Sequence, residues 1–188
     1  VIDDAERPGG VCLNWGCIPT KALLDAASHA EWLAEAEDRG FRNLKYTLDF
    51  PRVIERSREV VARLGKGIEG LLKKNQVRLV AGRGRIASTG LIEVTKGKTR
   101  EEIRADRILV ATGSKPRLLP GVSPDGERIF TSREILEIQR VPKSLVVLGA
   151  GAIGMEFAYF FRSLGAEVTI VEMLERILPQ EDPEVSDS

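Results

Sequence analysis

Apolar residues recur at helical spacing over much of the first 75 residues. Between residues 19 and 37, small and apolar side chains return every three or four positions, which predicts a helix with one buried face. A longer helix is expected after Asp49, an N-cap residue that precedes Pro51 in the first turn. Its apolar stripe comprises Val53, Val60, Val61, Leu64, Ile68, Leu71 and Leu72. The charges of Arg56, Arg58, Lys73 and Lys74 are interpreted as a solvated face.

After Asn75 the pattern changes to that of short strands. Residues 77–81, 91–95 and 102–103 are predicted as strands of a small antiparallel insert. Residues 107–111 form a continuous apolar run, which is typical of a strand buried in a sheet. Prolines and glycines then concentrate before residue 126. We therefore expect two domains, at 1–120 and 121–188.

A strand, a glycine-rich turn and a helix are predicted in direct succession near the C-terminus. The apolar run at 145–148 leads into the sequence GAGAIG, and a helix is expected to continue to about residue 164. A second strand is predicted at 168–171, and Glu172 follows it, 21 residues after Gly151. This order and offset are typical of a dinucleotide-binding βαβ unit.

The glycines of that turn have separate expected roles. Gly149 makes the tight turn, Gly151 lets the backbone approach a pyrophosphate, and Gly154 lets the helix pack closely on the strand. The helix N-terminus favours the phosphate charge. Glu172 is suited to the adenosine ribose and would repel a 2′-phosphate, so NAD is predicted rather than NADP. The expected contacts are Gly149, Gly151, Ile153, Gly154 and Glu172.

Two cysteines, Cys12 and Cys17, lie five residues apart and are the only ones in the chain. The chain adds a single histidine, His29, so a four-ligand zinc site is not expected. A closely spaced pair is better interpreted as a labile redox couple than as a structural disulfide, and two buried free cysteines are the alternative. Cys17 would lie at a helix N-terminus, which favours its thiolate.

The run GGVCLNWGCIPTKALL around these cysteines resembles the active-site signature of the pyridine nucleotide-disulfide oxidoreductases. Its wording is nearest to the dihydrolipoamide dehydrogenases of bacteria and plastids. The resemblance implies an α/β fold of Rossmann-like FAD- and NAD(P)-binding domains with a small antiparallel β insert. It also implies that Cys12 exchanges with a dithiol substrate and that Cys17 faces the flavin. Dihydrolipoamide would then be oxidised to lipoamide, with electrons passing through FAD to NAD.

Further site residues follow from the same resemblance. Lys21 is expected to pair with Glu156 beside the flavin, which completes a catalytic set with Cys12 and Cys17. The expected FAD contacts are Asp3 or Asp4, Gly9, Gly10, Lys21, Thr112 and Gly113. His29 is interpreted as structural, because a general base must reach the exchanging thiol.

The resemblance covers nearly all of the chain, and we expect the chain to be an internal fragment, truncated at both ends. The first FAD-binding unit would precede Val1, and a dimerisation domain with a His-Glu pair would follow Ser188. The fragment alone is expected to be inactive. The full-length parent is expected to be a homodimer that serves dihydrolipoamide or the lipoyl domain of a 2-oxo acid dehydrogenase complex.

Composition narrows the remaining possibilities. The chain has 188 residues, 43% of them hydrophobic, with 28 basic and 28 acidic side chains. Balanced, scattered charge argues against a nucleic-acid partner, and no apolar stretch has the length of a membrane helix. We expect a bacterial cytoplasmic protein, with an organellar matrix or stroma as the alternative. The rival functions are an NADP-dependent glutathione or mercuric reductase and, for this fragment, a non-catalytic nucleotide-binding module.

Overall fold

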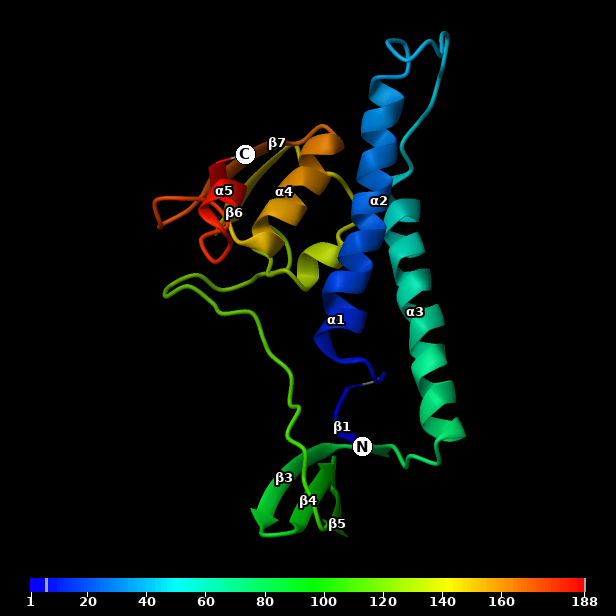
Figure 1. Ribbon diagram of the computed structural model, residues 1–188, viewed down its shortest axis with the longest axis vertical. Coiled ribbons are helices and arrows are strands. Elements are labelled where there is room, and N and C mark those ends of the chain that lie inside the picture. Colours follow the sequence, from blue (N-terminus) through cyan, green and yellow to red (C-terminus); the bar gives the residue numbers. More distant parts are fainter. Residues whose placement is uncertain (6, 188) are drawn as a thin grey trace.

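The computed structural model describes residues 1–5 and 7–187, and its centre is a pair of long helices. Helix α2 (Cys17–Ala34) and helix α3 (Phe50–Lys74) lie side by side and run in opposite directions (Figure 1). A short helix, α1 (Gly10–Trp15), precedes α2. Both long helices were predicted, and they are confirmed with small shifts of their ends.

Helix α3 begins as the sequence predicts but packs along only part of its length. The Asp49 side chain accepts a hydrogen bond from the Arg52 backbone N–H at 3.1 Å, which caps the first turn. The buried positions are Phe50, Ile54, Ser57, Val61 and Gly65. Within the predicted stripe, however, Leu64 is 42% exposed and Leu71 is 60% exposed. The helical period was therefore right, but the buried face ends at Gly65, about two thirds of the way along the helix.

A single core joins the helical pair to the C-terminal part of the chain. It contains Leu23 from α2 and Ile54 from α3, together with Phe160 and Phe161 from helix α4 (Ala152–Ser163). The rings of Phe160 and Phe161 meet edge-on, with centroids 4.9 Å apart. The short 3₁₀ helix η1 (Glu134–Glu137) adds two buried apolar side chains. The helix that carries Cys17 is thereby fixed against α4.

The predicted antiparallel insert is a three-stranded sheet in the order β3-β4-β5. Its strands are β3 (Arg83–Ser88), β4 (Leu91–Lys96) and β5 (Thr99–Arg104). Strand β3 was missed, because all six of its residues are exposed and give no apolar alternation. Of the predicted strand at 77–81, only β2 (Val80–Ala81) forms, in parallel pairing with β1 (Ile2–Asp3).

The prediction of a buried strand at 107–111 is wrong for this structure. These residues are irregular and open to solvent, with Leu109 93% exposed and Val110 64% exposed. A buried parallel strand needs hydrogen-bonded neighbours and a covered face. Among the described residues, the nearest parallel pairing, β1 with β2, is only two residues long. The segment instead connects the β3–β5 sheet to the C-terminal part as an extended strap (Figure 1).

The C-terminal part contains the predicted βαβ order. Strands β6 (Ser144–Leu148) and β7 (Glu167–Val171) pair in parallel, and α4 connects them. Gly165, with a φ of +92°, follows the end of α4 in the left-handed region that favours glycine. A last short helix, α5, covers Pro183–Asp187. The strand–helix–strand prediction is confirmed, whereas the division into domains at residue 120 stays a prediction.

Candidate active site and nucleotide loop

The two cysteines lie on either side of a break between two helices. Cys12 is in α1, Cys17 is the first residue of α2, and Gly16 between the helices has φ −137° and ψ −122°. A Cβ atom at Gly16 would come within 3.1 Å of the Val11 carbonyl oxygen, so glycine permits the close approach of α1. Both cysteines are free and exposed. They are available for exchange with a ligand in solution.

The side chain of Cys17 affects the ionisation of Cys12. A hydrogen bond with the Cys17 side chain raises the pKa of the Cys12 thiol, and desolvation and the charge of Cys17 act in the same direction. Cys17 occupies the helix N-terminus that the sequence predicts. The pair therefore combines proximity along the chain, exposure and an adjacent helix dipole, which favour thiol–disulfide exchange.

Helix α1 is held in place by polar contacts of Asn14. Its side-chain amide donates to the Gly10 carbonyl oxygen at 3.0 Å and to the Arg7 carbonyl oxygen at 3.3 Å. Its own carbonyl oxygen accepts from Nη1 of Arg58 on α3 at 2.9 Å. The interpretation of Arg58 as part of a solvated face is therefore wrong. The residue is partly buried because it lies at the edge of the packed stripe of α3.

Lys21 and Glu156 form an ion pair between α2 and α4. The Lys21 ammonium donates to Oε1 of Glu156, and this hydrogen bond raises the pKa of Lys21. Lys21 lies one helical turn after Cys17, so the pair joins the cysteine-bearing helix to the helix that follows the glycine loop. The structure brings these predicted partners together, and their catalytic role stays a prediction.

A second polar bridge between the same helices was not anticipated. Both oxygens of the Glu31 carboxylate accept hydrogen bonds, from the Tyr159 hydroxyl at 2.6 Å and from the Ser163 hydroxyl at 2.7 Å. These bonds lower the pKa of Glu31, and the bond to Glu31 raises the pKa of Tyr159. The only sequence signal was a set of polar residues at helical spacing, which is common on solvated faces.

The glycine loop has the geometry of a phosphate-binding turn. Gly149 has a φ of +104°, and a Cβ atom at Gly154 would lie 2.0 Å from the Gly149 carbonyl oxygen. A Cβ atom at Gly151 would meet no described atom within 4 Å. Because the N-terminus of α4 opens onto this free space, its N–H groups can bind an anion there. Ile153, in the first turn, is 59% exposed.

Glu172 closes one side of this loop. One carboxylate oxygen accepts from the Ala150 N–H at 2.7 Å, and the other accepts from the N–H groups of Met173 and Leu174. These bonds lower the pKa of Glu172, so the carboxylate is charged at neutral pH. It therefore places a negative charge directly beside the open loop.

Gly9 and Gly10 lie at the start of α1 beside Cys12, whereas no described contact brings Asp3, Thr112, Gly113 or His29 to the cysteines. Asp3 accepts from the Ala5 N–H at 2.9 Å, and Thr112 and Gly113 lie in the exposed strap. His29 is exposed on α2, with Nδ1 2.6 Å from the Asp25 carbonyl oxygen of its own helix. The proposed roles of these residues stay predictions.

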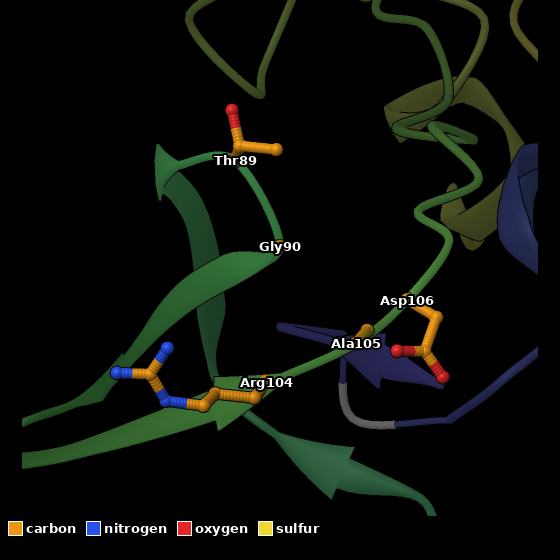
Figure 2. Close-up of a pocket in the computed structure, with 5 residues that line it drawn as sticks. All are labelled: Thr89, Gly90, Arg104, Ala105 and Asp106. Carbon is orange, nitrogen blue, oxygen red and sulfur yellow. The ribbon is translucent and has the colours of Figure 1, made fainter.

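A hollow of about 300 Å³ lies at the insert rather than at the cysteines. Figure 2 shows its lining residues, Thr89, Gly90, Arg104, Ala105 and Asp106. It is located where β4 begins and β5 ends, and the three-stranded sheet lies at one end of the molecule, away from α4 (Figure 1). It therefore does not belong to the candidate site.

The chain matches one protein family over its whole length. The profile described as pyridine nucleotide-disulphide oxidoreductase covers residues 1–188. The chain belongs to this family. The family prediction, made from the cysteine run, is thereby confirmed.

Relatives within the pyridine nucleotide-disulphide oxidoreductases have consistent names. The chain is 46% identical over 180 residues to a dihydrolipoyl dehydrogenase of Zymomonas mobilis subsp. mobilis, covering 95% of this chain and 38% of that protein. It is 45% identical over 182 residues to a dihydrolipoyl dehydrogenase of Chlorobaculum tepidum, covering 96% of this chain and 39% of that protein. The chain thus spans about two fifths of the length of these relatives.

Solved structures of disulphide oxidoreductases have the same fold. LpdA of Mycobacterium tuberculosis superposes with a TM-score of 0.87 at 31% identity, over 99% of this chain and 41% of LpdA. The HOCl-induced flavoprotein disulfide reductase RclA of Escherichia coli superposes with a TM-score of 0.80 at 29% identity, over 99% of this chain and 39% of RclA. The predicted α/β fold class is confirmed.

This family implies FAD and a pyridine nucleotide as cofactors. The open space at Gly151 and the N-terminus of α4 fit a dinucleotide pyrophosphate. Cys17 is exposed at the start of α2, and a Cβ atom at Gly10, at the start of α1, would meet no described atom within 4 Å, so both helix starts are open to a ligand. None of the described helices is long and apolar enough to cross a membrane.

Proposed function

We propose that the chain supplies the exchanging cysteine pair and the start of the nucleotide site of a dihydrolipoyl dehydrogenase. The whole enzyme would oxidise dihydrolipoamide to lipoamide and reduce NAD⁺, with FAD between the two. The observation that carries this proposal is the placement of two exposed cysteines on either side of the α1–α2 break. The names of the relatives indicate the substrate class.

The chemistry of the pair is thiol–disulfide exchange. Starting from the Cys12–Cys17 disulfide, a substrate thiolate attacks the sulfur of Cys12 and releases Cys17 as a thiolate at the start of α2. The second substrate thiol then attacks the substrate sulfur of the mixed disulfide and releases Cys12. The substrate dithiol is oxidised to a cyclic disulfide, and both cysteines are left reduced. FAD, when bound, supplies the acceptor for their two electrons.

Lys21 and Glu156 hold the start of α2 against α4 in this proposal. Their ion pair lies one turn after Cys17. The positive charge of Lys21 thus lies one turn from the helix terminus at which Cys17 would be released.

NAD⁺ is the proposed acceptor because of Glu172. Its charged carboxylate, bonded to the Ala150 N–H, lies at the edge of the open loop. A ribose hydroxyl can donate to such a carboxylate, whereas a 2′-phosphate would be repelled. An NADP-dependent disulfide reductase is the competing function, and the preference for NADH over NADPH separates the two.

We further propose a homodimeric bacterial cytoplasmic enzyme. Its partner would be the lipoyl domain of a 2-oxo acid dehydrogenase complex. The charge balance of the chain and the names of the relatives support this setting.

The test on this chain is exchange with dihydrolipoamide. The oxidised chain is mixed with dihydrolipoamide, quenched with an alkylating reagent and analysed by mass spectrometry. We expect two new thiols, at Cys12 and Cys17, for each lipoamide formed. Mixed instead with oxidised lipoamide, Cys17→Ser should form a mixed disulfide at Cys12, with the second lipoamide sulfur released as a thiol and trapped by alkylation, and Cys12→Ser should form none at that site. An oxidised chain without a Cys12–Cys17 disulfide would contradict the proposal and favour a non-catalytic nucleotide-binding module.

A further inference from the structure

Trp15, located between the two cysteines in sequence, contacts two arginines from distant parts of the chain. The guanidinium carbon of Arg133 lies over its ring, 4.2 Å from the centroid. The guanidinium carbon of Arg58 also lies over the ring, 5.3 Å from the centroid. Arg58 belongs to α3, and Arg133 directly precedes η1. The last residue of α1 is therefore held from two directions along the fold.

Burial and a backbone hydrogen bond hold Arg58 in this contact. Its Nη1 donates to the Asn14 carbonyl oxygen, and its Nε and Nη2 are buried with no hydrogen-bond partner among the described residues. Burial lowers the pKa of Arg58, and the nearby Glu137 opposes this effect. A guanidinium in this setting gains from the face of an aromatic ring. Arg58 therefore fixes both the carbonyl of Asn14 and the ring of Trp15.

The position of Trp15 affects the geometry of the cysteine pair. Trp15 ends α1, Gly16 breaks the helix, and Cys17 begins α2. A disulfide forms only within a narrow range of Cα separations and side-chain directions. The orientation of α1 relative to α2 therefore determines how often the two sulfurs are correctly placed, which is their effective concentration for each other.

We propose that Arg58 and Arg133 are positioning residues that hold Trp15 and thereby stabilise the Cys12–Cys17 disulfide. This inference rests on the proposed function, because it concerns the same exchanging pair. Arg133 precedes η1, whose Ile135 and Leu136 belong to the core shared with α4. The contact thus connects α1, which carries Cys12, to the core that also supports α4 and the glycine loop.

The experiment measures the disulfide equilibrium of the complete chain. The chain is equilibrated in buffers of reduced and oxidised glutathione, and its free thiols are counted after alkylation. Two cysteine thiols are oxidised, one glutathione disulfide is reduced to two thiols, and the two protons pass to glutathione. We expect Arg58→Met and Arg133→Met each to lower the equilibrium constant for disulfide formation by about two- to fivefold, the worth of one cation–π contact.

Matched controls separate the contact from general loss of charge. Arg63→Met removes an exposed arginine from α3, and Arg128→Met removes one before η1. Both should leave the constant unchanged. Trp15→Phe should retain part of the effect, whereas Trp15→Leu should lower the constant as the arginine variants do. A constant that depended on arginine charge alone would not change in Trp15→Leu.

The outcomes distinguish the two proposals. Constants for Arg58→Met and Arg133→Met that equal or exceed that of the unaltered chain would overturn the role of the arginines and leave the exchange function intact. Failure of the unaltered chain to form the disulfide would overturn both. If circular dichroism shows that Arg58→Met is unfolded, the test rests on the equilibrium constants of Trp15→Leu and of Arg133→Met, whose side chain is exposed.

Discussion

At the scale of single residues, the candidate site depends on close approaches of the backbone. Gly16 permits α1 to approach α2, and Gly154 permits α4 to approach the turn that precedes it. The two positions differ from Gly151, where the space is open. The same residue type therefore permits close packing at two positions and borders open space at the third.

Gly154→Ala should destabilise the chain by about 1–3 kcal/mol, because the new methyl group must displace packed backbone. Its Cβ atom would be 2.0 Å from the Gly149 carbonyl oxygen and 3.2 Å from Cγ1 of Val147. Urea unfolding followed by circular dichroism measures the loss. Gly151→Ala, with a φ of −75° and no described atom within 4 Å, is the matched control and should unfold at nearly the same midpoint. Equal losses for both variants would contradict the assignment.

The residues of the site were predictable to different degrees. The cysteine run and the glycine loop are local patterns, so the sequence located them without a structure. The approach of Lys21 to Glu156 followed only from family resemblance, since 135 residues separate them. Arg58 was misassigned because its burial depends on α1, Trp15 and Arg133, none of which helical periodicity in α3 describes.

At the scale of elements, α2 is the link between the parts of the fold. It packs against α3 on one side and α4 on another, and two polar bridges reinforce the contact with α4. Periodicity predicted these helices because each buries one face. It failed for β3, which buries no residue, and for 107–111, where an apolar run lacks neighbours in the described chain.

Tyr159→Phe should remove the bridge from α4 to Glu31, and its effect should depend on pH. The folded-state pKa of Glu31 is lowered, so its contribution to stability is present above the unfolded pKa and is lost as the pH falls through the folded value. The folded-state pKa of Tyr159 is raised, so the contribution of Tyr159 to stability is present below its unfolded pKa and is lost as the pH rises through its folded pKa. The difference in urea midpoint from the unaltered chain should thus be largest near neutral pH.

The control for this prediction is Tyr46→Phe, at an exposed position in the loop between α2 and α3. It should have the same midpoint as the unaltered chain at every pH. A Tyr159→Phe effect that stays constant between acidic and neutral pH would show that the hydroxyl acts without the Glu31 carboxylate.

Asp49→Ala should remove the cap of α3 and destabilise the chain by about 1 kcal/mol, since one N–H of the first turn loses its acceptor. Thermal unfolding at pH 7 measures the change. Asp38→Ala, an exposed position after α2, provides the comparison and should be nearly neutral. An unchanged melting temperature for Asp49→Ala would mean that packing of Phe50 alone sets the start of α3.

At the scale of the whole molecule, one core supports both the cysteine pair and the nucleotide loop. Leu23 lies less than two turns after Cys17 on α2, and it shares that core with Phe157, Phe160 and Phe161 of α4. The β3–β5 sheet contributes no residue to this cluster among those described. The two candidate sites should therefore lose their structure together, while the sheet can unfold separately.

Phe160→Ala tests this coupling. Phe160 is 1% exposed and touches the rings of Phe50 and Phe161, so its loss leaves a cavity where three helices meet. Removal of a buried phenylalanine costs about 3–5 kcal/mol.

The fluorescence of Trp15 and Trp32, the two tryptophans of the chain, reports on α1 and α2, although the substitution lies in α4. We expect the fluorescence and helical circular dichroism transitions to shift together to lower urea. Phe41→Ala, at a 53% exposed ring that contacts Trp32 at a tilt of 60°, is the control and should shift the midpoint far less. If Phe160→Ala moved the circular dichroism transition and left the tryptophan transition in place, the cysteine helix would be stable without α4, and the two sites would not share a common support.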